Sequence, residues 1–432
     1  MKKHHIGLVL TFVLVPAAGA CAQDRKPAPG ASAQCAPIET AAANAPAQKP
    51  AFAGQTRACG VSSGDIFDVT VVAKGLQSPW AVEPLPDGNF LVTEKSGQLR
   101  IVTAKGEIGQ PITGILAVGQ GGVSAESGKG GLPPIAARGQ GGLLDVALSP
   151  AFVTDRTIFW SFSEQREGGT GTSVARGTLT ADRRNLEQVR VIFRAMPTYN
   201  NGLHFGSRLA FGPDGMLYVT TGDRFDKAVT RPQAQQLNSH FGKVIRINPD
   251  GTVPADNPFA KQAGALPENW DIGHRNIQSA AFDANGQLWT VEHGAKGGDE
   301  LNRIEKGTNY GWPIISYGEE YSGEPIPGNI TAREGLEQPV YYWDPVIAPS
   351  GMQFYTGDAF PAWKDSVFIG GLASQKLVRL VIKDNKVTGE EHLLTDRRQR
   401  IRDVRQGPDG ALYVVTDGGE LLKIAPKKAA TN

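Results

Sequence analysis

Short apolar segments separated by turn residues recur along the chain and predict β-strands. Four segments share one pattern, in which apolar positions lead into a Pro/Asp/Asn-Gly turn, followed by a run rich in β-branched and aromatic residues. Pro sets φ at one position of such a turn, and Gly accepts a positive φ at another. The four segments are Leu85–Thr93, Phe211–Thr220, Phe282–Thr290 and Gly407–Thr416.

Two looser copies of the pattern fill the gaps, at 148–161 and at 354–370. Six copies spaced by roughly 55 to 70 residues leave room for four short strands in each unit. We therefore predict an all-β fold, a six-bladed β-propeller with four-stranded antiparallel blades, over residues 61–426. The alternative is a stack of β-sandwiches with coincidental Asp-Gly turns, which six copies in register disfavour.

The N-terminus has the layout of a secretory signal. Two lysines precede an apolar run at 6–15 that is too short to span a bilayer, and small residues follow it. We predict a signal peptide over 1–22, with export to the periplasm. The sequence around Cys21 also resembles a lipobox, so lipid attachment there, with anchoring to the outer membrane, and simple cleavage after Ala20 or Ala22 are both open.

Residues 23–60 are rich in Ala, Pro, Gln and Ser and carry almost no aliphatic bulk. Such a composition predicts a disordered tether. If Cys21 is lipidated or removed, Cys35 and Cys59 remain as a pair for a disulfide in an exported protein. The alternative is that both stay unpaired in the tether.

Composition narrows the classes of partner. Lys and Arg number 44 against 43 Asp and Glu, and this near-neutral balance argues against a nucleic-acid-binding protein. The chain has 53 glycines in 432 residues, about 12% against an average of about 7%, as expected for a chain of many turns. The Gly-rich stretch 119–142 lacks the setting of a dinucleotide site or a P-loop, and no serine nucleophile elbow is present.

The segments that flank the repeats carry candidate chemistry. His204 precedes one repeat and Asp223 follows it, so a hairpin would bring the carboxylate to the imidazole, as a general base requires. The alternative is a structural histidine. The segments 273–276 and 292–300 flank another repeat, and the glycines, carboxylates and free carbonyls of 292–300 suit Ca²⁺, without EF-hand spacing. The alternative there is a solvated acidic loop.

The densest run of charges lies at 396–405. Strand alternation places Arg400 and Arg402 on one face, where two guanidinium groups could bind an anionic ligand. The alternatives are a solvated edge or a nucleic-acid patch, and the near-neutral charge speaks against the second. Cys and His are too scattered for a zinc cluster.

Taken together, these segments resemble the soluble aldose sugar dehydrogenases of the glucose/sorbosone dehydrogenase family over about 76–422. The matching segments, in family order, are Gly139–Leu144, 204–223, Gly273–Asn276, Glu292–Asn302, Asn309–Pro313 and Arg400–Asp403. The resemblance implies an exported six-bladed propeller that uses pyrroloquinoline quinone (PQQ) and Ca²⁺.

The resemblance also implies roles. His204 would remove the proton of the sugar's C1 hydroxyl, with Asp223 orienting it, while hydride passes from C1 to PQQ. Ca²⁺ would polarise the quinone carbonyl, and Arg275 would stabilise the oxyanion. The residues implied in cofactor binding are Gln140, Arg275, Asn276, Tyr321, Gly371, Leu372, Ala373, Arg400 and Arg402. The residues implied in calcium binding are Gly294 and Ala295, through their carbonyls, with Glu300 and Tyr310 at a site in the same segment.

Two departures from the family are visible. Ala373 stands where relatives can place a lysine that faces PQQ, which removes a cationic partner, and Ala295 stands where some have proline. We expect an oxidoreductase that converts aldoses to lactones and passes electrons to an unidentified acceptor, as a monomer or weak dimer. One rival is a Ca²⁺-dependent, lactonase-like propeller hydrolase, which would not need Arg400 and Arg402. Another is a non-catalytic binding propeller, in which His204 and Asp223 would be incidental.

Overall fold

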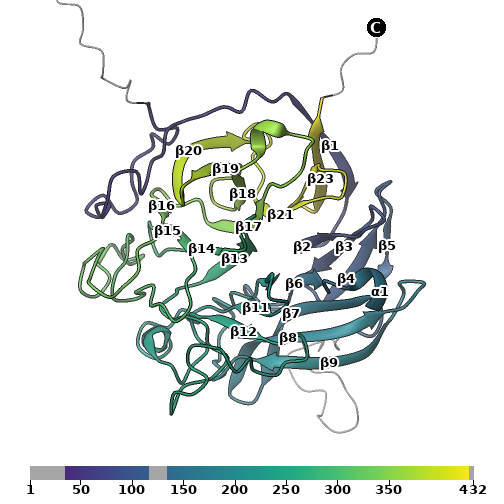
Figure 1. The fold of residues 1–432 in the computed structure, drawn as a ribbon, viewed down its shortest axis with the longest axis horizontal. Coiled ribbons are helices and arrows are strands. Elements are labelled where there is room, and N and C mark those ends of the chain that lie inside the picture. The colour runs from purple at the N-terminus through teal and green to yellow at the C-terminus, as the bar shows by residue number, and fades with distance from the viewer. Residues whose placement is uncertain (1–34, 116–133, 428–432) are drawn as a thin grey trace, which may run out of the picture. The chain divides into compact units, whose positions relative to one another are not determined.

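The computed structural model describes residues 35–115 and 134–427. The predicted signal peptide with Cys21, the tether residues up to 34, and positions 119–133 of the Gly-rich stretch lie outside the described residues. Six antiparallel sheets surround a central axis, which confirms the six-bladed β-propeller (Figure 1). In the described ranges, no helix is long and apolar enough to cross a membrane.

The strands follow one another blade by blade. Each blade starts at the axis and runs outward, and the first strands of neighbouring blades contact one another around the ring: β2, β6, β10, β13, β17 and β21. Blade one holds β2 (Pro79–Pro84), β3 (Phe90–Glu94), β4 (Gln98–Val102) and β5 (Ile108–Pro111). Blade two holds β6 (Leu143–Leu148), β7 (Thr157–Arg166), β8 (Gly169–Leu179) and β9 (Leu186–Arg194), with the short helix α1 (Phe152–Asp155) in its first turn.

The remaining blades repeat this arrangement. Blade three holds β10 (Leu209–Phe211), β11 (Leu217–Thr220) and β12 (Val244–Ile247), with the short 3₁₀ helix η1 (Arg231–Gln235) between the last two. Blade four holds β13 (Ile277–Phe282), β14 (Leu288–Glu292), β15 (Asp299–Arg303) and β16 (Tyr341–Trp343). Blade five holds β17 (Pro349–Phe354), β18 (Ser366–Gly371), β19 (Leu377–Lys383) and β20 (Lys386–Leu393), with η2 (Pro361–Trp363) in its first turn.

Blade six closes the ring with both ends of the domain. It holds β21 (Ile401–Gln406), β22 (Leu412–Thr416) and β23 (Glu420–Pro426), and its outer strand is β1 (Phe67–Lys74). The antiparallel register pairs Phe67 with Pro426 and Lys74 with Glu420. The first strand of the propeller therefore belongs to its last blade, which ties the two ends of the chain together.

The predicted repeats are the turns between the first and second strands of the blades. The glycine of the first copy, Gly88, has φ +86°, and Gly410 of the last copy has φ +75°. A side chain is strained in this left-handed region, so the turn selects glycine. Because these turns share one end of the ring, the segments that enter the first strands share the other end. Most candidate site residues lie on those segments or just after the second strands, which end on the same side.

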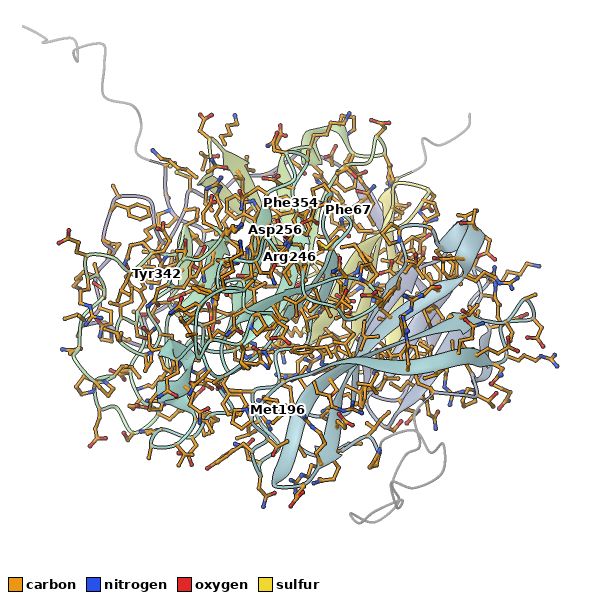
Figure 2. The ribbon with its side chains drawn as sticks, turned by 60° about the horizontal axis from the view of Figure 1, so that its bottom comes forward. Phe67, Met196, Arg246, Asp256, Tyr342 and Phe354 are labelled. Atoms are coloured by element: carbon orange, nitrogen blue, oxygen red, sulfur yellow. The ribbon has the colours of Figure 1, made fainter. Side chains whose placement is uncertain are left out.

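Blade three departs from the predicted four strands. Among the described residues its sheet has three, and residues 268–270 lie along the outer strand β12, with Arg246 N donating to Glu268 O (2.9 Å). Four prolines between 249 and 267 interrupt the chain here, and proline cannot donate to a ladder. The Arg246 side chain holds the loop by bonds to Asp256 (2.8 Å) and Asn257 (2.9 Å). Arg246 and Asp256 are labelled next to each other in Figure 2.

The prediction of a disordered tether is wrong for residues 36–60, which pack on blades four and five. The carboxylate of Asp344 accepts the main-chain N–H groups of Asn44 (2.5 Å) and Ala45 (3.1 Å). Gln55 is fully buried and donates to Pro339 O (2.9 Å). The segment is ordered by hydrogen bonds to residues about 300 positions away, which its own composition does not reveal. Cys35 and Cys59 are both disulfide-bonded.

A cluster of buried charges links the first strands around the axis. Arg208, just before β10, donates to Asp145 of β6 (2.9 Å) and lies 3.2 Å from Asp403 of β21. Arg405 of β21 bonds Asp403 (3.1 Å) and faces Glu83 of β2 (3.4 Å). Each charge has a partner of opposite sign, which offsets the cost of removing it from water. The cluster links four of the six blades around the axis.

Candidate functional site

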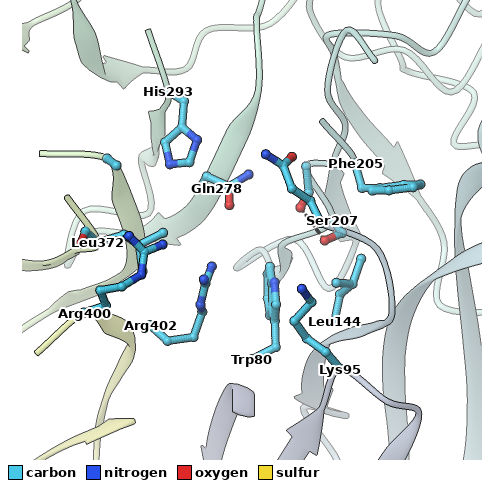
Figure 3. Close-up of a pocket in the computed structure, with 13 residues that line it drawn as sticks. Trp80, Lys95, Leu144, Phe205, Ser207, Gln278, His293, Leu372, Arg400 and Arg402 are labelled. Carbon is cyan, nitrogen blue, oxygen red and sulfur yellow. Dashed lines mark hydrogen bonds between the residues drawn. The ribbon is translucent and has the colours of Figure 1, made fainter. Parts of the chain in front are cut away.

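A cavity of about 160 Å³ opens at the end of the ring where the first strands begin (Figure 3). All six blades border it, because each contributes the start of its first strand or the end of its second. The lining residues are Trp80, Lys95, Gln140, Leu144, Phe205, Gly206, Ser207, Gln278, His293, Ala348, Leu372, Arg400 and Arg402. Four of these are candidates from the sequence: Gln140, Leu372, Arg400 and Arg402.

Two arginines and a lysine form a cationic wall on one side of this cavity. Arg400 and Arg402 each donate through Nε to Asp417 (both 2.7 Å), so they share one face as strand alternation predicts. Arg400 also donates to Leu372 O (3.2 Å). Lys95, just after β3, extends this lining, with Trp80 between it and Arg402 in Figure 3. Neither Lys95 nor Asp417 is a candidate from the sequence.

The predicted base and its orienting carboxylate are in contact. His204 Nδ1 lies 2.6 Å from Asp223 Oδ1, and both side chains are buried, with His204 only 4% exposed. Asp223 Oδ1 also accepts from Phe225 N (2.8 Å), and its Oδ2 accepts from Trp312 Nε1 (2.8 Å). An ionised carboxylate can only accept, so the neutral imidazole carries its proton on Nδ1. This leaves Nε2 as the nitrogen that can take up a proton.

Burial and charge keep this imidazole neutral. Burial lowers the pKa of His204, and the nearby Arg275 lowers it further, while Asp223 opposes both effects. The pKa of Asp223 is also lowered, because His204 and Arg275 outweigh the opposing effect of burial. The pair is thus poised as a neutral histidine next to an ionised aspartate. This is the resting state that a general base needs.

The loop that carries His204 is fixed from both sides. Gln140 Oε1 accepts from His204 N (2.7 Å), which ties the cavity wall to the predicted base. The buried Arg224 donates to Leu203 O (2.8 Å) and Thr170 O (2.7 Å) and lies over the ring of Phe205. His204 itself has φ +48°, a strained value that the surrounding bonds must maintain. Arg224 is a positioning residue that the sequence did not single out.

Arg275 and Asn276 are held by a buried carboxylate behind them. Glu292 Oε2 accepts from Arg275 N (2.6 Å) and Asn276 N (3.3 Å), while its Oε1 contacts His274 Nδ1 (2.7 Å). Asn276 Oδ1 then accepts from Gly206 N (3.2 Å) at the cavity. The Arg275 guanidinium lies 5.4 Å from the ring of Trp312. Neither side chain lines the cavity directly, but both support residues that do.

Two main-chain carbonyls in the predicted calcium segment converge on one positive group. Arg275 Nη1 donates to His293 O (3.1 Å) and to Gly294 O. A Cβ on Gly294 would lie 2.3 Å from the carbonyl oxygens of Gly297 and Gly298, so only glycine fits this compact loop. Asp299 fixes the loop by accepting from Gly294 N (2.9 Å).

The other predicted calcium residues make contacts of their own. Ala295 pairs with Gly297 within the loop. Burial and the nearby Glu292 raise the pKa of Glu300 to about 8, and Asn302 donates to its Oε2 (3.2 Å). The Tyr310 hydroxyl donates to Arg303 O (2.7 Å) and accepts from Glu305 N (2.8 Å). In the described residues, no group of three His, Cys, Asp or Glu side chains converges on a metal position.

Comparison with known proteins places this propeller in a family. The family model described as "Glucose / Sorbosone dehydrogenase" matches residues 76–423, from the first blade to the last. The chain belongs to this family. It is 43% identical over 368 residues to the aldose sugar dehydrogenase YliI of Escherichia coli, covering 83% of this chain and 93% of the relative. It is 27% identical over 428 residues to quinoprotein glucose dehydrogenase B of Acinetobacter calcoaceticus, covering 81% and 85%.

Solved structures agree. The apo form of the soluble aldose sugar dehydrogenase of E. coli superposes with a TM-score of 0.76 at 42% identity, covering 84% of this chain and all of that one. The PQQ-bound aldose sugar dehydrogenase of Streptomyces coelicolor superposes with a TM-score of 0.65 at 29% identity, covering 85% and 100%.

In this member of the glucose/sorbosone dehydrogenase family, three further candidates do not line the cavity. Tyr321 is 63% exposed and lies outside the cavity lining, 6.3 Å from the ring of Phe225, which packs on His204. Gly371 and Ala373 flank the lining residue Leu372 in a turn tied to blade five, with Ala373 N donating to Ile347 O (3.0 Å). Ala373 is exposed and brings no charge to the cavity.

His293 lines the cavity, although the sequence pattern points only to the segment 292–300 that contains it. Its Nε2 contacts Pro349 O (2.8 Å), which ties blade four to blade five at the mouth of the site. Burial, with His204 and Arg275 nearby, lowers the pKa of His293 to about 3. His293 is therefore neutral under ordinary conditions and adds no charge to the wall. A lone histidine in a Gly-rich segment offers no signal that separates this role from others.

Proposed function

We propose that the protein oxidises aldose sugars at C1 to lactones with PQQ and Ca²⁺. The observation that carries this proposal is the neutral, buried His204, oriented by Asp223 (2.6 Å), beside a cavity with a cationic wall. A base next to an anion-binding cavity suits proton removal from a hydroxyl in the presence of an anionic cofactor. The relatives, a PQQ-bound aldose sugar dehydrogenase among them, support the same chemistry.

The residues present fit the cofactor. PQQ carries three carboxylates, and guanidinium groups bind carboxylates with charge-assisted hydrogen bonds. Arg400 and Arg402 would hold one side of it, while Gln140 and Leu372 lie around the same cavity. The lining residues include no Asp or Glu to repel an anion.

The residues present also fit a hard cation. The carbonyl oxygens of His293 and Gly294 already point at one positive group, the Arg275 guanidinium, and carbonyl oxygens are ligands that Ca²⁺ prefers. These carbonyls, with that of Ala295 as the resemblance implies, would hold the ion next to the cavity in place of the Arg275 contact. When bound, PQQ supplies a quinone that accepts hydride and Ca²⁺ supplies Lewis-acid polarisation of it.

The chain's own residues handle the proton. His204 Nε2 accepts the proton of the C1 hydroxyl as the C–H electron pair leaves C1, so the sugar loses two electrons and two hydrogens and becomes the lactone. Asp223 stabilises the imidazolium that forms, because its carboxylate is buried and ionised 2.6 Å from Nδ1. Arg275 does not line the cavity, but its charge acts on the His204–Asp223 pair and would help to stabilise negative charge that develops on the reacting oxygen.

Reconstitution tests this proposal. Purified protein treated with chelator is titrated with PQQ in the presence and absence of Ca²⁺, and aldose oxidation is followed with an artificial electron acceptor. We expect saturable PQQ binding and turnover that depends on both additions. No PQQ binding and no turnover would refute the proposal, and hydrolysis of a lactone without PQQ would favour a propeller hydrolase instead.

We also propose export, since the first 22 residues have the layout of a signal peptide. Periplasmic recovery of the full-length protein supports this, and recovery of Cys21→Ser in the soluble fraction with wild type in the membrane fraction would indicate lipidation. Cytoplasmic retention of the wild-type chain would contradict export.

A further inference from the structure

The cationic wall holds more positive charge than the arginines recognised from the sequence. Three cations line the cavity, Lys95, Arg400 and Arg402, and the thirteen lining residues include no acidic side chain. Behind them, the single carboxylate of Asp417 accepts from both arginines (2.7 Å each). Asp417 is thus already used by two guanidinium groups. Three cations and one carboxylate leave the wall with a positive excess.

Lys95 is the cation in this wall without an acidic partner. Among the described residues, no Asp or Glu oxygen lies within 4 Å of its ammonium, whereas Arg400 and Arg402 both reach Asp417. Lys95 Nζ donates to Gly139 O (2.9 Å), which uses one of the three donors of an ammonium group. Burial and the charge of Arg402 lower the pKa of Lys95, with Asp417 opposing them. Two cations in one partly buried cavity, close enough for the charge of one to act on the other, favour an anion between them.

The main chain holds Lys95 in place for this role. Lys95 N donates to Ser78 O (3.1 Å), and Lys95 O accepts from Leu143 N (3.2 Å), so blades one and two both fix it. A Cβ on Gly142 would lie 2.2 Å from Lys95 O, which shows how closely the two segments approach. The side chain extends beside Trp80 into the cavity (Figure 3).

We propose that Lys95, which enters the cavity from blade one, is a cofactor-binding residue whose ammonium pairs with a carboxylate of PQQ. This inference rests on the proposed function. It accounts for the departure at Ala373, where a cationic partner is absent, because a ligand with three carboxylates then still meets three cations. Lys95 supplies its charge from the segment after β3 in blade one, whereas Ala373 lies in the turn after β18 in blade five.

Direct binding measurements test the role of Lys95. PQQ is titrated into the wild-type protein, K95M, K95R and K105M with Ca²⁺ present, and binding is followed by calorimetry. Lys105 is an exposed lysine in the turn after β4, so K105M removes the same charge away from the cavity. Losing one charge-assisted contact should raise the Kd of K95M about 10- to 100-fold, while K95R and K105M stay within about threefold of wild type. The Kd of K95M should also depend less steeply on salt.

The outcomes separate this inference from the proposed function. If wild type binds PQQ and K95M binds within about threefold of it, Lys95 is not a cofactor contact, and the proposed function still stands. If wild type fails to bind PQQ, both are refuted. An unchanged thermal unfolding midpoint for K95M shows that weaker binding reports the lost contact, and K95Q serves as a second neutral variant should K95M unfold.

Discussion

Replacing Asp223 by asparagine should remove most of the turnover while leaving the propeller folded. The Asp223 carboxylate accepts three hydrogen bonds, from His204 Nδ1 (2.6 Å), Phe225 N (2.8 Å) and Trp312 Nε1 (2.8 Å). An asparagine amide can present its oxygen on one side only. If the oxygen faces Trp312, the amide NH₂ faces His204 Nδ1, which must then accept and leave its proton on Nε2. That tautomer cannot act as the base.

The other amide orientation is also costly. If the oxygen faces His204, the NH₂ group opposes the Trp312 N–H, and the charge that stabilises the imidazolium is lost. Loss of effective base catalysis is worth about 10²- to 10⁴-fold in rate, or about 2.7 to 5.4 kcal/mol of barrier. We therefore expect the kcat of Asp223→Asn to fall by about that factor, with a Kd for PQQ close to that of wild type.

Asp283→Asn is a matched control. Asp283 also accepts a tryptophan N–H, from Trp289 (3.0 Å), and main-chain N–H groups, from Asn285 (2.8 Å) and Gln287 (3.0 Å), but it lies in a blade turn at the opposite end of the ring. Its kcat should stay near wild type. Steady-state aldose oxidation at saturating acceptor measures both variants. A kcat for Asp223→Asn within about threefold of wild type would refute the assignment of the pair.

Three other outcomes are expected. Burial and Arg275 lower the pKa of His204 below the ordinary histidine value of about 6.5. The plateau of kcat/KM should therefore extend below pH 6.5, and kcat/KM should fall only as the pH drops through the lowered pKa of His204. An acid limb centred above pH 6.5 would contradict this. Arg224→Met should lower kcat far more than it weakens PQQ binding, because the guanidinium positions the His204 loop; equal losses in both would argue for a general folding defect. Asp403→Ala should lower the free energy of unfolding by about 3 to 5 kcal/mol in denaturant titrations, since it leaves Arg208 and Arg405 short of a buried partner; a change below about 1 kcal/mol would contradict the role of the axial cluster.

The fold was predictable because its signal is local and repeated. Each Asp-Gly turn, such as the one at Gly88, needs only a few neighbouring residues, and six copies multiply the signal. The His204–Asp223 contact was accessible for the same reason, since one hairpin separates the two residues. Arg400 and Arg402 followed from strand alternation. Each of these predictions needed one element or two adjacent ones.

The predictions that failed or were missing depend on contacts between distant parts of the chain. Lys95 lines the cavity beside Arg402 only because blade one meets blade six when the ring closes. Residues 36–60 are ordered by partners such as Asp344, about 300 positions away, although their composition indicates disorder. The outer edge of blade three is shaped by prolines that replace a regular strand. Composition and periodicity do not encode such contacts.

One measurement tests the central claim most directly. The reconstituted protein, loaded with PQQ and Ca²⁺ and kept free of oxygen and of any electron acceptor, is mixed with one aldose, and the absorbance of the bound quinone is followed over a single turnover. We expect the quinone to be reduced as lactone forms in equal amount, more slowly when C1 carries deuterium, and we expect His204→Ala to bind PQQ without reducing it. A bound quinone that stays oxidised in wild-type protein with aldose present would refute PQQ-dependent aldose oxidation by this protein.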